Sequence, residues 1–399
     1  MKAENIGKSL KIRSKTAPSR IVYQPTESNN CEKNGMPTEI TFKKYEEIAA
    51  GAPGILHIES IDVTPETQAR SNRMVLIDET LSGYKELVER IRKINKEALI
   101  IFQLSHAGRL SDPAFKAPVA IYQRGTAPIK VLTTEEIQEA RDQFVSCAVL
   151  AWKAGADGVD FKQAHGFLGD DFLHPANNRK DQYGGNFENR TRFFLEAYRA
   201  MRKEIRDPDF LIGSRISPFE GIPGGCGTAD KDGLVEDLTE MRKFVKIMEA
   251  EGIDFINVSA GYAAANLELL LPSDQYPEGV PRLFGWTRMI KDEVTIPVIG
   301  SGYSYLKEGT NNLYGEDKEK KSLLYHAENN IEKGWVDFIG IGRQAIADPH
   351  FAKKLLENRQ DEIKWCTTCG GCGALLGNNK PIGCTVYERE FTRILESVS

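Results

Sequence analysis

The chain has 399 residues, of which 41% are hydrophobic and 27% charged, and its formal net charge is −5. These proportions are ordinary for a soluble globular enzyme and exclude a largely disordered chain. The acidic balance offers no positive field for nucleic acid or an anionic membrane surface, so neither is an expected partner. The first twelve residues, MKAENIGKSLKI, lack the apolar core of a signal peptide, and no stretch approaches the ~20 apolar residues of a membrane span. We therefore expect a cytoplasmic protein.

Short apolar runs rich in β-branched residues alternate with helical patterns along the chain. Such runs are typical of parallel strands buried on both faces. The predicted strands are 20–24, 55–58, 99–104, 158–161, 210–216, 255–259, 296–300 and 338–342. The predicted helices are 41–50, 84–96, 133–154, 190–206, 235–251 and 321–333, the third of which begins with a capping box of Thr133 and Glu136.

This alternation predicts an α/β protein, a (β/α)8 TIM barrel over residues 1–360. Residues 361–399 are expected to form a short Cys-rich C-terminal extension. A doubly wound open sheet is the alternative. It is disfavoured because no GxGxxG motif or P-loop opens a helix anywhere in the chain.

Polar side chains follow most of the predicted strands. In barrels of this class, side chains at the carboxyl ends of strands face the active site. Lys162 and His165 follow one strand and are candidates for substrate contact, although polar residues in a surface loop would look the same. Gln103 and Arg215 lie at two other strand ends. An amide and a cation there suit a flat heterocycle such as a flavin ring, but either residue could instead be a paired polar group of the barrel core.

The last two strand ends are rich in glycine. Gly300, Ser301 and Gly302 follow one strand, and Gly342 and Arg343 follow the next. Glycine lets backbone N–H groups approach an anion closely, and Arg can bind a phosphate through two hydrogen bonds. Barrels commonly bind phosphate at this place, so we expect a phosphate-bearing ligand, with ordinary tight turns as the alternative.

Four of the seven cysteines cluster near the C-terminus. They are Cys366, Cys369, Cys372 and Cys384. Three thiols within seven residues and a fourth close by are typical of iron–sulfur ligation, whereas structural zinc more often uses two separated CxxC pairs. The spacing favours a [4Fe-4S] cluster and leaves zinc or free thiols as alternatives.

Together these segments resemble the old yellow enzymes, or NADH:flavin oxidoreductases, from about Arg20 to the C-terminus. The matching motifs are QPT (24–26), QLSHAGR (103–109), VDFKQAHGFL (159–168), DQYGGNFENRTRF (181–193), SRISP (214–218), GSG (300–302) and GIGRQAIADP (340–349). The resemblance implies an FMN-dependent barrel. It assigns cofactor binding to Pro25, Thr26, Gln103, Arg215, Gly300, Ser301, Gly302, Gly342 and Arg343.

The resemblance also implies a reaction. NADH or NADPH, or another electron donor, would reduce FMN, and FMN would then reduce the C=C bond of an α,β-unsaturated carbonyl compound, including a bulky enone of the steroid or bile-acid type. Lys162 and His165 occupy the positions of the His/His or His/Asn pair that holds the substrate carbonyl oxygen. Two alternatives stay open: an amine dehydrogenase or demethylase resembling trimethylamine dehydrogenase, and a non-catalytic flavin-binding protein.

Two departures from the family pattern concern the catalytic residues. Lys162 replaces the usual His, which would put a full cation beside the substrate oxygen. Phe167 stands where the family has its Tyr proton donor, and Phe cannot donate a proton. Tyr262 is the favoured replacement, with Tyr183, His106 and solvent as alternatives.

The cysteine pattern resembles a longer branch of the family, which includes dienoyl-CoA reductase and binds a [4Fe-4S] cluster. Those relatives have one more residue between the second and third cysteines and carry a further flavin/NAD domain. Without that domain, a cluster here would need an external electron-donor protein or would be a structural remnant. A homo-oligomer is compatible with the sequence.

Overall fold

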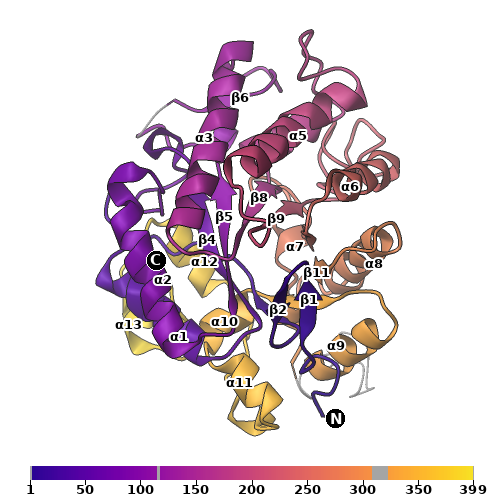
Figure 1. Cartoon of the computed structure of the whole chain (residues 1–399). Coiled ribbons are helices and arrows are strands. Elements are labelled where there is room, and N and C mark those ends of the chain that lie inside the picture. Colours follow the sequence, from indigo (N-terminus) through magenta and orange to yellow (C-terminus); the bar gives the residue numbers. More distant parts are fainter. Residues whose placement is uncertain (1, 115–116, 308–321, 399) are drawn as a thin grey trace.

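A closed barrel of eight parallel strands forms the centre of the molecule, with neighbours in the order β10-β11-β12-β3-β4-β5-β8-β9 (Figure 1). The computed structural model describes residues 2–114, 117–307 and 322–398. The barrel strands are β3 (Ile21–Tyr23), β4 (Ile55–Asp62), β5 (Leu99–Ser105), β8 (Gly158–Gln163), β9 (Leu211–Ile216), β10 (Phe255–Val258), β11 (Val298–Gly300) and β12 (Phe338–Ile341). Every strand predicted from the sequence is present, and the (β/α)8 fold is confirmed.

Helices surround the barrel and bury one face each against it. The longer ones are α1 (Glu39–Ala50), α2 (Leu81–Ile94), α3 (Thr134–Lys153), α5 (Phe187–Glu204), α6 (Thr239–Glu251), α8 (Gly279–Lys291) and α9 (Leu323–Glu332). In α2 the buried residues Tyr84, Leu87, Val88 and Ile91 recur at helical spacing, which gives the helix its apolar face. The predicted capping box is present at α3, where Thr133 Oγ1 accepts from Glu136 N and Glu136 Oε2 accepts from Thr133 N.

The sequence analysis missed α8 and most of the short helices. These are α4 (Leu168–Leu173), α7 (Leu267–Leu270), α10 (Arg343–Ala347), α11 (Phe351–Leu356), α12 (Gly371–Gly377) and α13 (Arg389–Glu396). The predicted helix 235–251 begins later, at Thr239, and Lys321 of the predicted helix 321–333 lies outside the described residues. In the described part of the chain, no helix is both long and apolar enough to cross a membrane.

A hairpin that the sequence analysis also missed closes one end of the barrel. Its strands β1 (Leu10–Ile12) and β2 (Lys15–Ala17) pair antiparallel and lie in front of the barrel in Figure 1. Ile12 and Ala17 pack in one apolar cluster with Ile55 and Leu99, the first residues of β4 and β5, and with Val22 of β3. The hairpin therefore plugs the amino ends of the strands and leaves the opposite end for a functional site. A second two-stranded sheet, β6 (Val119–Ala120) with β7 (Lys130–Val131), lies outside the barrel.

Stacked aromatic rings fix β8 and the segment that follows it. Phe161 of β8 stacks on Phe144 of α3 with ring centroids 4.2 Å apart. Phe172 of α4 stacks on Phe193 of α5 with centroids 4.1 Å apart. Contacts of this kind hold the carboxyl end of β8 in a rigid apolar frame.

The C-terminal extension is bound to the rim of the barrel by hydrogen bonds. Cys366 N donates to Oε1 of Gln344 in α10 at 2.8 Å, and Ile382 N donates to Ser28 O at 3.2 Å. Asn29 Nδ2 donates to the carbonyl oxygens of Leu376 and Lys380. The extension thus contacts the segments after β12 and β3, and the domain boundary at residue 360 stays a prediction.

Candidate active site

Lys162 lies at the carboxyl end of β8 with its ammonium group buried. Its Nζ is 3.1 Å from Ser60 Oγ and 3.4 Å from Glu27 Oε1. Nζ also lies 3.2 Å from the centroid of the Phe167 ring. Phe167 therefore covers the Lys162 head group with an apolar face, which weakly attracts a cation.

The surroundings of Lys162 disfavour its charged form. Burial lowers the pKa of Lys162 well below its usual value, and the nearby charges of Arg73, Arg215 and Arg70 lower it further. The sequence analysis expected a full cation at this position. In the structure, Lys162 instead loses its proton at a lower pH than an exposed lysine does.

His165 and Gly166 form a tight turn directly after β8. Both have positive φ, +69° and +82°, and this left-handed conformation is unusual for a side chain such as His. The turn brings His165 Nε2 within 2.7 Å of Ser259 Oγ, just after β10. Burial lowers the pKa of His165 well below its usual value, with further contributions from Arg215 and Lys162, so the ring is neutral at neutral pH.

Tyr262 packs directly against this turn. A Cβ atom on Gly166 would lie 2.4 Å from Tyr262 Cε2, so only glycine fits there. The backbone of Tyr262 pairs with that of His165 in an isolated parallel bridge. Burial raises the pKa of the Tyr262 hydroxyl, as does the charge of Asp171, so the phenol keeps its proton. The structure thus brings together the three predicted catalytic residues.

The other two candidate proton donors lie elsewhere. Tyr183 donates its hydroxyl to Glu196 Oε2 on α5 at 2.8 Å, on the outer side of the barrel wall. His106 Nδ1 accepts from Gly108 N at 3.1 Å, and the residue lines a crevice with Thr67 and Ser111. Neither contact involves Lys162 or His165.

Arg215 and Gln103 belong to a polar network in the barrel interior. Arg215 donates to Gln24 Oε1 at 3.3 Å and to Ser259 Oγ at 3.2 Å, while Gln103 Nε2 donates to Asp160 Oδ2 at 3.2 Å. Asn257 joins Gln24 to Asp160. Burial lowers the pKa of Arg215 to about 10, against the opposing charge of Asp160.

One atom of this network tests the fit of a flavin. Arg215 Nε is buried and has no hydrogen-bond partner among the described residues. Because an unpaired buried donor is costly, this atom indicates that a ligand with an acceptor completes the site. The isoalloxazine ring of FMN has such acceptors along its edge, so Arg215 and Gln103 fit the cofactor.

The predicted phosphate-binding loops also lie as expected at adjoining strand ends. Gly302 has φ of +103°, and Gly342 N donates to Ser304 Oγ at 2.9 Å. Ser301 Oγ donates to Val258 O at 2.7 Å, so its backbone N–H is the group left for an anion. Arg343 donates to Pro272 O at 2.5 Å and keeps further N–H groups for other acceptors.

Pro25 and Thr26 follow β3 beside these loops. A Cβ atom on Gly342 would lie 3.4 Å from Thr26 Cγ2, which places Thr26 against the second glycine-rich loop. Lys44 Nζ donates to Thr26 O at 2.9 Å and fixes the backbone there. Pro25 precedes it at the same strand end. All the predicted cofactor-binding residues are therefore distributed around one rim.

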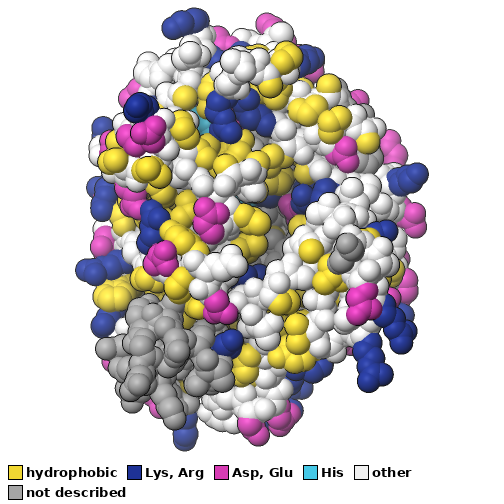
Figure 2. All heavy atoms as spheres, turned by 180° about the vertical axis from the view of Figure 1, so that it is seen from behind, with side chains coloured by type: hydrophobic (Ala, Val, Ile, Leu, Met, Phe, Trp, Pro, Cys, Tyr) yellow, Lys and Arg dark blue, Asp and Glu magenta, His cyan; other side chains and the backbone are white. Residues whose placement is uncertain are grey.

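The end of the molecule opposite the hairpin is the face on which these groups lie. Figure 2 shows the molecule from behind, where hydrophobic side chains gather over the middle of the face and a group of Lys and Arg side chains borders them. The mixture of apolar and cationic side chains suits a flat, anionic cofactor with an organic substrate.

The four C-terminal cysteines lie near one another and near Arg343. Burial raises the pKa of Cys366, and it raises that of Cys372 to about 11, while the charge of Arg343 opposes both rises. For Cys369, hydrogen bonds from Gly371 N–H and Thr385 outweigh burial and lower the pKa. Cys384 is buried, and its N–H donates to Glu388 Oε1.

The sequence analysis did not anticipate the charged side chains around Lys162. Arg73 forms ion pairs with Asp62 at 2.7 Å and Glu27 at 2.5 Å, and Arg70 also pairs with Glu27. Glu27 follows β3, and Arg70 and Arg73 lie in the loop after β4, which ends at Asp62; no regular spacing marks these residues. In the sequence, the only signal for these charges was the presence of Arg70 and Arg73 in the segment after a predicted strand.

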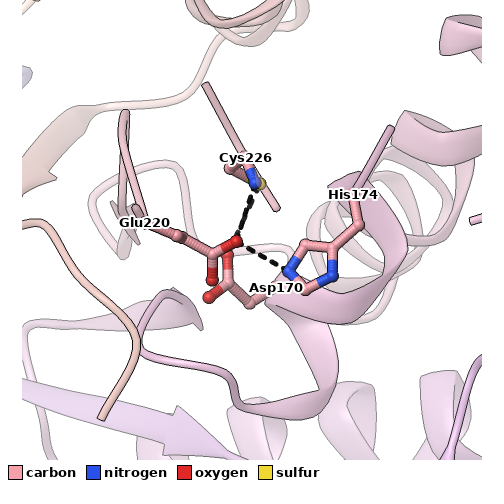
Figure 3. Close-up of side chains that lie close together, drawn as sticks. All are labelled: Asp170, His174, Glu220 and Cys226. Carbon is pink, nitrogen blue, oxygen red and sulfur yellow. Dashed lines mark hydrogen bonds and ion pairs between the residues drawn. The ribbon is translucent and has the colours of Figure 1, made fainter. Parts of the chain in front are cut away.

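A second unanticipated group lies just beyond the His165 turn. Ligand atoms of Asp170, His174, Glu220 and Cys226 lie within 4.8 Å of one another (Figure 3). Gly166 N donates to Asp170 Oδ2 at 2.8 Å, which ties this group to the turn. Cys226 is one of the three cysteines that lie outside the C-terminal cluster in the sequence.

The closed barrel, the unpaired guanidinium nitrogen and the glycine-rich loops fit a TIM-barrel protein that binds a flavin. Comparison with known proteins identifies the family. The model of the NADH:flavin oxidoreductase / NADH oxidase family matches residues 6–308, and the chain belongs to this family. The predicted resemblance to this family is thereby confirmed.

Similar proteins cover nearly all of the chain. It is 32% identical over 381 residues to NADH oxidase of Thermoanaerobacter brockii. This match covers 92% of this chain and 53% of that protein. It is 30% identical over 382 residues to N,N-dimethylglycine/sarcosine dehydrogenase of Chromohalobacter salexigens, and this match covers 92% of this chain and 50% of that protein. The chain thus spans about half the length of these curated relatives.

A solved structure of a 2-naphthoyl-CoA reductase in complex with 2-naphthoyl-CoA has the same fold. The TM-score is 0.81 at 24% sequence identity, and the match covers 98% of this chain and 58% of the other. The similarity therefore includes the C-terminal extension as well as the barrel.

Proposed function

We propose that this protein reduces the C=C bond of an α,β-unsaturated carbonyl compound with electrons from NADH or NADPH. The observation that carries the proposal is the meeting of Lys162, His165 and Tyr262 at the carboxyl end of the barrel, beside the predicted flavin-binding residue Arg215. Two hydrogen-bond donors and one acid in such a group are what the reduction of an enone requires.

Bound FMN would supply the hydride for the β-carbon of the substrate. Lys162 and His165 would donate hydrogen bonds to the carbonyl oxygen, on which negative charge develops during the reaction. His165 is a neutral imidazole with one N–H to donate, and the turn at Gly166 holds its ring in place. The developing oxyanion would also raise the pKa of Lys162 again, because opposite charges favour one another's charged forms.

Tyr262 would deliver the proton to the α-carbon. It takes over from the residue at position 167, where Phe lies against Lys162 and has no proton to give. The raised pKa of Tyr262 keeps the phenol protonated between turnovers. The Arg124 guanidinium lies 4.5 Å from the centre of the Tyr262 ring and would stabilise the phenolate formed after transfer.

The charges around the site support an electron-poor or anionic substrate. Arg70, Arg73 and Arg215 all lower the pKa of Lys162, so they create a positive field at the place where the carbonyl group would bind. A cationic amine would be repelled there, whereas an enone with an acidic substituent would be attracted.

The test is an anaerobic titration of the FMN-loaded protein with NADPH or NADH, followed by 2-cyclohexenone. We expect the nicotinamide to bleach the flavin bands and the enone to restore them, with cyclohexanone as the product. Tyr262→Phe should slow the reoxidation by enone about 100-fold and leave the bleaching step unchanged. A flavin that is bleached but not reoxidised by any enone, with or without a carboxylate substituent, would refute ene-reduction.

The similarity to N,N-dimethylglycine/sarcosine dehydrogenase favours a second candidate, the oxidation of an N-methyl amino acid. Such a substrate carries a carboxylate, which the positive field would attract, and an ammonium group, which it would repel. Anaerobic addition of sarcosine or N,N-dimethylglycine to the oxidised protein separates the two candidates. Bleaching by either compound, without nicotinamide, would select amine oxidation.

We infer that Cys366, Cys369, Cys372 and Cys384 hold a [4Fe-4S] cluster that exchanges electrons with the flavin or with an external donor protein. The observation that supports the cluster is the spacing, with three thiols within seven residues and a fourth a short loop away. Structural zinc more often uses two separated CxxC pairs. Iron and sulfide analysis of protein purified without oxygen tests this, and zinc in place of iron would refute it.

A further inference from the structure

Four metal-ligand side chains converge in a buried position that the flavin reaction does not use. Asp170, His174 and Glu220 are fully buried, and Cys226 is 3% exposed. Figure 3 shows the carboxyl groups of Asp170 and Glu220 side by side, with His174 and Cys226 on either side of them. These residues come from α4, the residue after it, the loop after β9, and a glycine-rich turn of that loop.

The geometry of the cluster matches the requirements of a small tetrahedral ion. Ligands bound at about 2.0–2.3 Å lie roughly 3.3–3.8 Å apart around such an ion. Cys226 Sγ is 3.8 Å from Asp170 Oδ1, and His174 Nε2 is 2.8 Å from Glu220 Oε2. A displacement of well under 1 Å would bring the second pair to the separation that an ion imposes.

Two atoms that point into the cluster lack hydrogen bonds. His174 Nε2 and Glu220 Oε1 are buried and have no hydrogen-bond partner among the described residues. The 2.8 Å approach of His174 to Glu220 is close enough for an ion pair but does not have hydrogen-bond geometry. Because unpaired buried acceptors are costly, these atoms indicate a missing positive partner.

The outer contacts of the cluster resemble those of a metal site. Tyr122 Oη lies 2.8 Å from His174 Nδ1, the ring nitrogen that faces away from the cluster. A hydrogen bond from Nδ1–H to this oxygen leaves the lone pair of Nε2 for a metal ion, which is the usual arrangement around a ligating histidine. Cys226 N donates to Glu220 Oε2 at 2.7 Å and orients that carboxylate.

We propose that Asp170, His174, Glu220 and Cys226 bind one transition-metal ion of the zinc class. A thiolate, an imidazole and two carboxylates favour zinc over magnesium or calcium, which prefer oxygen ligands only. Four protein ligands leave no open position, so the site is structural. A crevice lined by Leu173, Cys226 and Met241 borders one of the four ligands, Cys226.

The ion would position the catalytic turn. Asp170 Oδ2 accepts the hydrogen bond from Gly166 N, so a metal that holds Asp170 also fixes the residue after His165. The ion would in the same way fasten the loop of residues 220–226 to α4. The proposal does not depend on the identity of the substrate or on ene-reduction.

The test is the metal content of the full chain in a Cys369→Ser/Cys372→Ser background, which removes thiols that could bind zinc at the C-terminus. After dialysis against a weak chelator, mass spectrometry of the elements should find one zinc ion per chain. His174→Gln and Cys226→Ser should each weaken zinc binding at least tenfold. Cys147→Ser, at a buried cysteine of α3, is the matched control and should retain the ion.

Cobalt substitution provides a readout that does not depend on the folding of any ligand variant. The difference spectrum between cobalt-loaded and zinc-loaded protein cancels the flavin and should show intense tetrahedral ligand-field bands with a thiolate charge-transfer band. Cys226→Ser should remove the charge-transfer band. Protein that binds neither zinc nor cobalt at stoichiometric concentration would overturn the proposal and leave a hydrogen-bond chain from Tyr122 through His174 to Glu220. Retention of the ion in both His174→Gln and Cys226→Ser would also overturn it.

Discussion

Two buried charged regions adjoin each other in this protein and have opposite signs. On one side of the His165–Gly166 turn, Lys162 lies with Arg70, Arg73 and Arg215, and their positive field is partly compensated by Glu27 and Asp62. On the other side, Asp170 and Glu220 lie close to Asp171 in a negative one. The strand ends supply Lys162 and Arg215, whereas loops and a short helix supply the acidic group.

The difference teaches how the two regions are held. Lys162 and Arg215 are direct neighbours in the register between β8 and β9, so the barrel itself places them. Asp170 and Glu220 accept hydrogen bonds from the backbone of loops, at Gly166 N and Cys226 N, and they also contact Cys226 Sγ and His174 Nε2. The barrel register therefore fixes the first region, whereas hydrogen bonds between loop residues fix the second.

The largest effect is expected from the positive region. Lys162→Met removes one of the two donors to the carbonyl oxygen, and kcat with an enone should fall about 100-fold, in the range found when one donor to an oxyanion is removed. Stopped-flow reoxidation of the reduced flavin by 2-cyclohexenone measures it. Phe167→Leu removes the ring from Lys162 but keeps the donor, and it should cost less than about tenfold. Equal losses in the two variants would mean that Lys162 acts only by packing.

The sequence was sufficient to predict the positive region in outline. The strand pattern located β8, β9 and β10, and with them Lys162, Arg215 and the segment that carries Tyr262. This succeeds because strands buried on both faces leave continuous apolar runs, and their carboxyl ends must share one rim.

The sequence was insufficient for the groups that loops bring together. Asp170 and Cys226 are 56 residues apart, and no periodic pattern links them. Arg73 lowers the pKa of Lys162 from a position where it pairs with Asp62, four residues beyond the predicted end of β4. Helix α8 was missed because its sequence, GVPRLFGWTRMIK, contains two glycines and a proline, which reduce helix propensity.

A second prediction concerns the turn that separates the two regions. Gly166→Ala should destabilise the protein by about 2–4 kcal/mol, because the added methyl group meets the Tyr262 ring and the backbone stays left-handed. Gly125→Ala is the matched control, since Gly125 also has positive φ, +70°, but has nothing within 4 Å of the new Cβ. It should cost only about 1 kcal/mol. Urea unfolding measures both, and equal costs would show that Tyr262 moves aside freely.

A third prediction tests whether the barrel rim binds the flavin through Arg215. Arg215→Met removes a charge-assisted donor, which is worth about 1.5–3 kcal/mol, so FMN should bind at least about tenfold more weakly. Arg124→Met removes a positive charge that lies over Tyr262 instead and should leave the FMN dissociation constant within about twofold. Fluorescence quenching of FMN on titration with flavin-free protein gives both constants. A normal FMN affinity in Arg215→Met would place the flavin elsewhere.

The smallest effect concerns the cost of burying Lys162. The unfolded chain keeps the lysine proton up to its ordinary pKa of 10.5, whereas the folded protein loses it at a lower pH. Between these two values the unfolded state binds more protons, so the stability of the wild-type protein rises with pH, and below the folded-state pKa the full penalty remains. Lys162→Met carries no such penalty and should be more stable at pH 7, by on the order of 1 kcal/mol.

This advantage of Lys162→Met should shrink as the pH approaches 10.5, which thermal unfolding over a pH series would show. Lys153→Met, at an exposed lysine in the last turn of α3, is the control and should change stability by less than about 0.5 kcal/mol at any pH. A variant Lys162→Met that is less stable than the wild type at pH 7 would show that Glu27, Ser60 and the Phe167 ring outweigh the like charges. The positive region would then be a compensated ion network. In that case the two regions would differ in the ligands that they bind and not in their net charge.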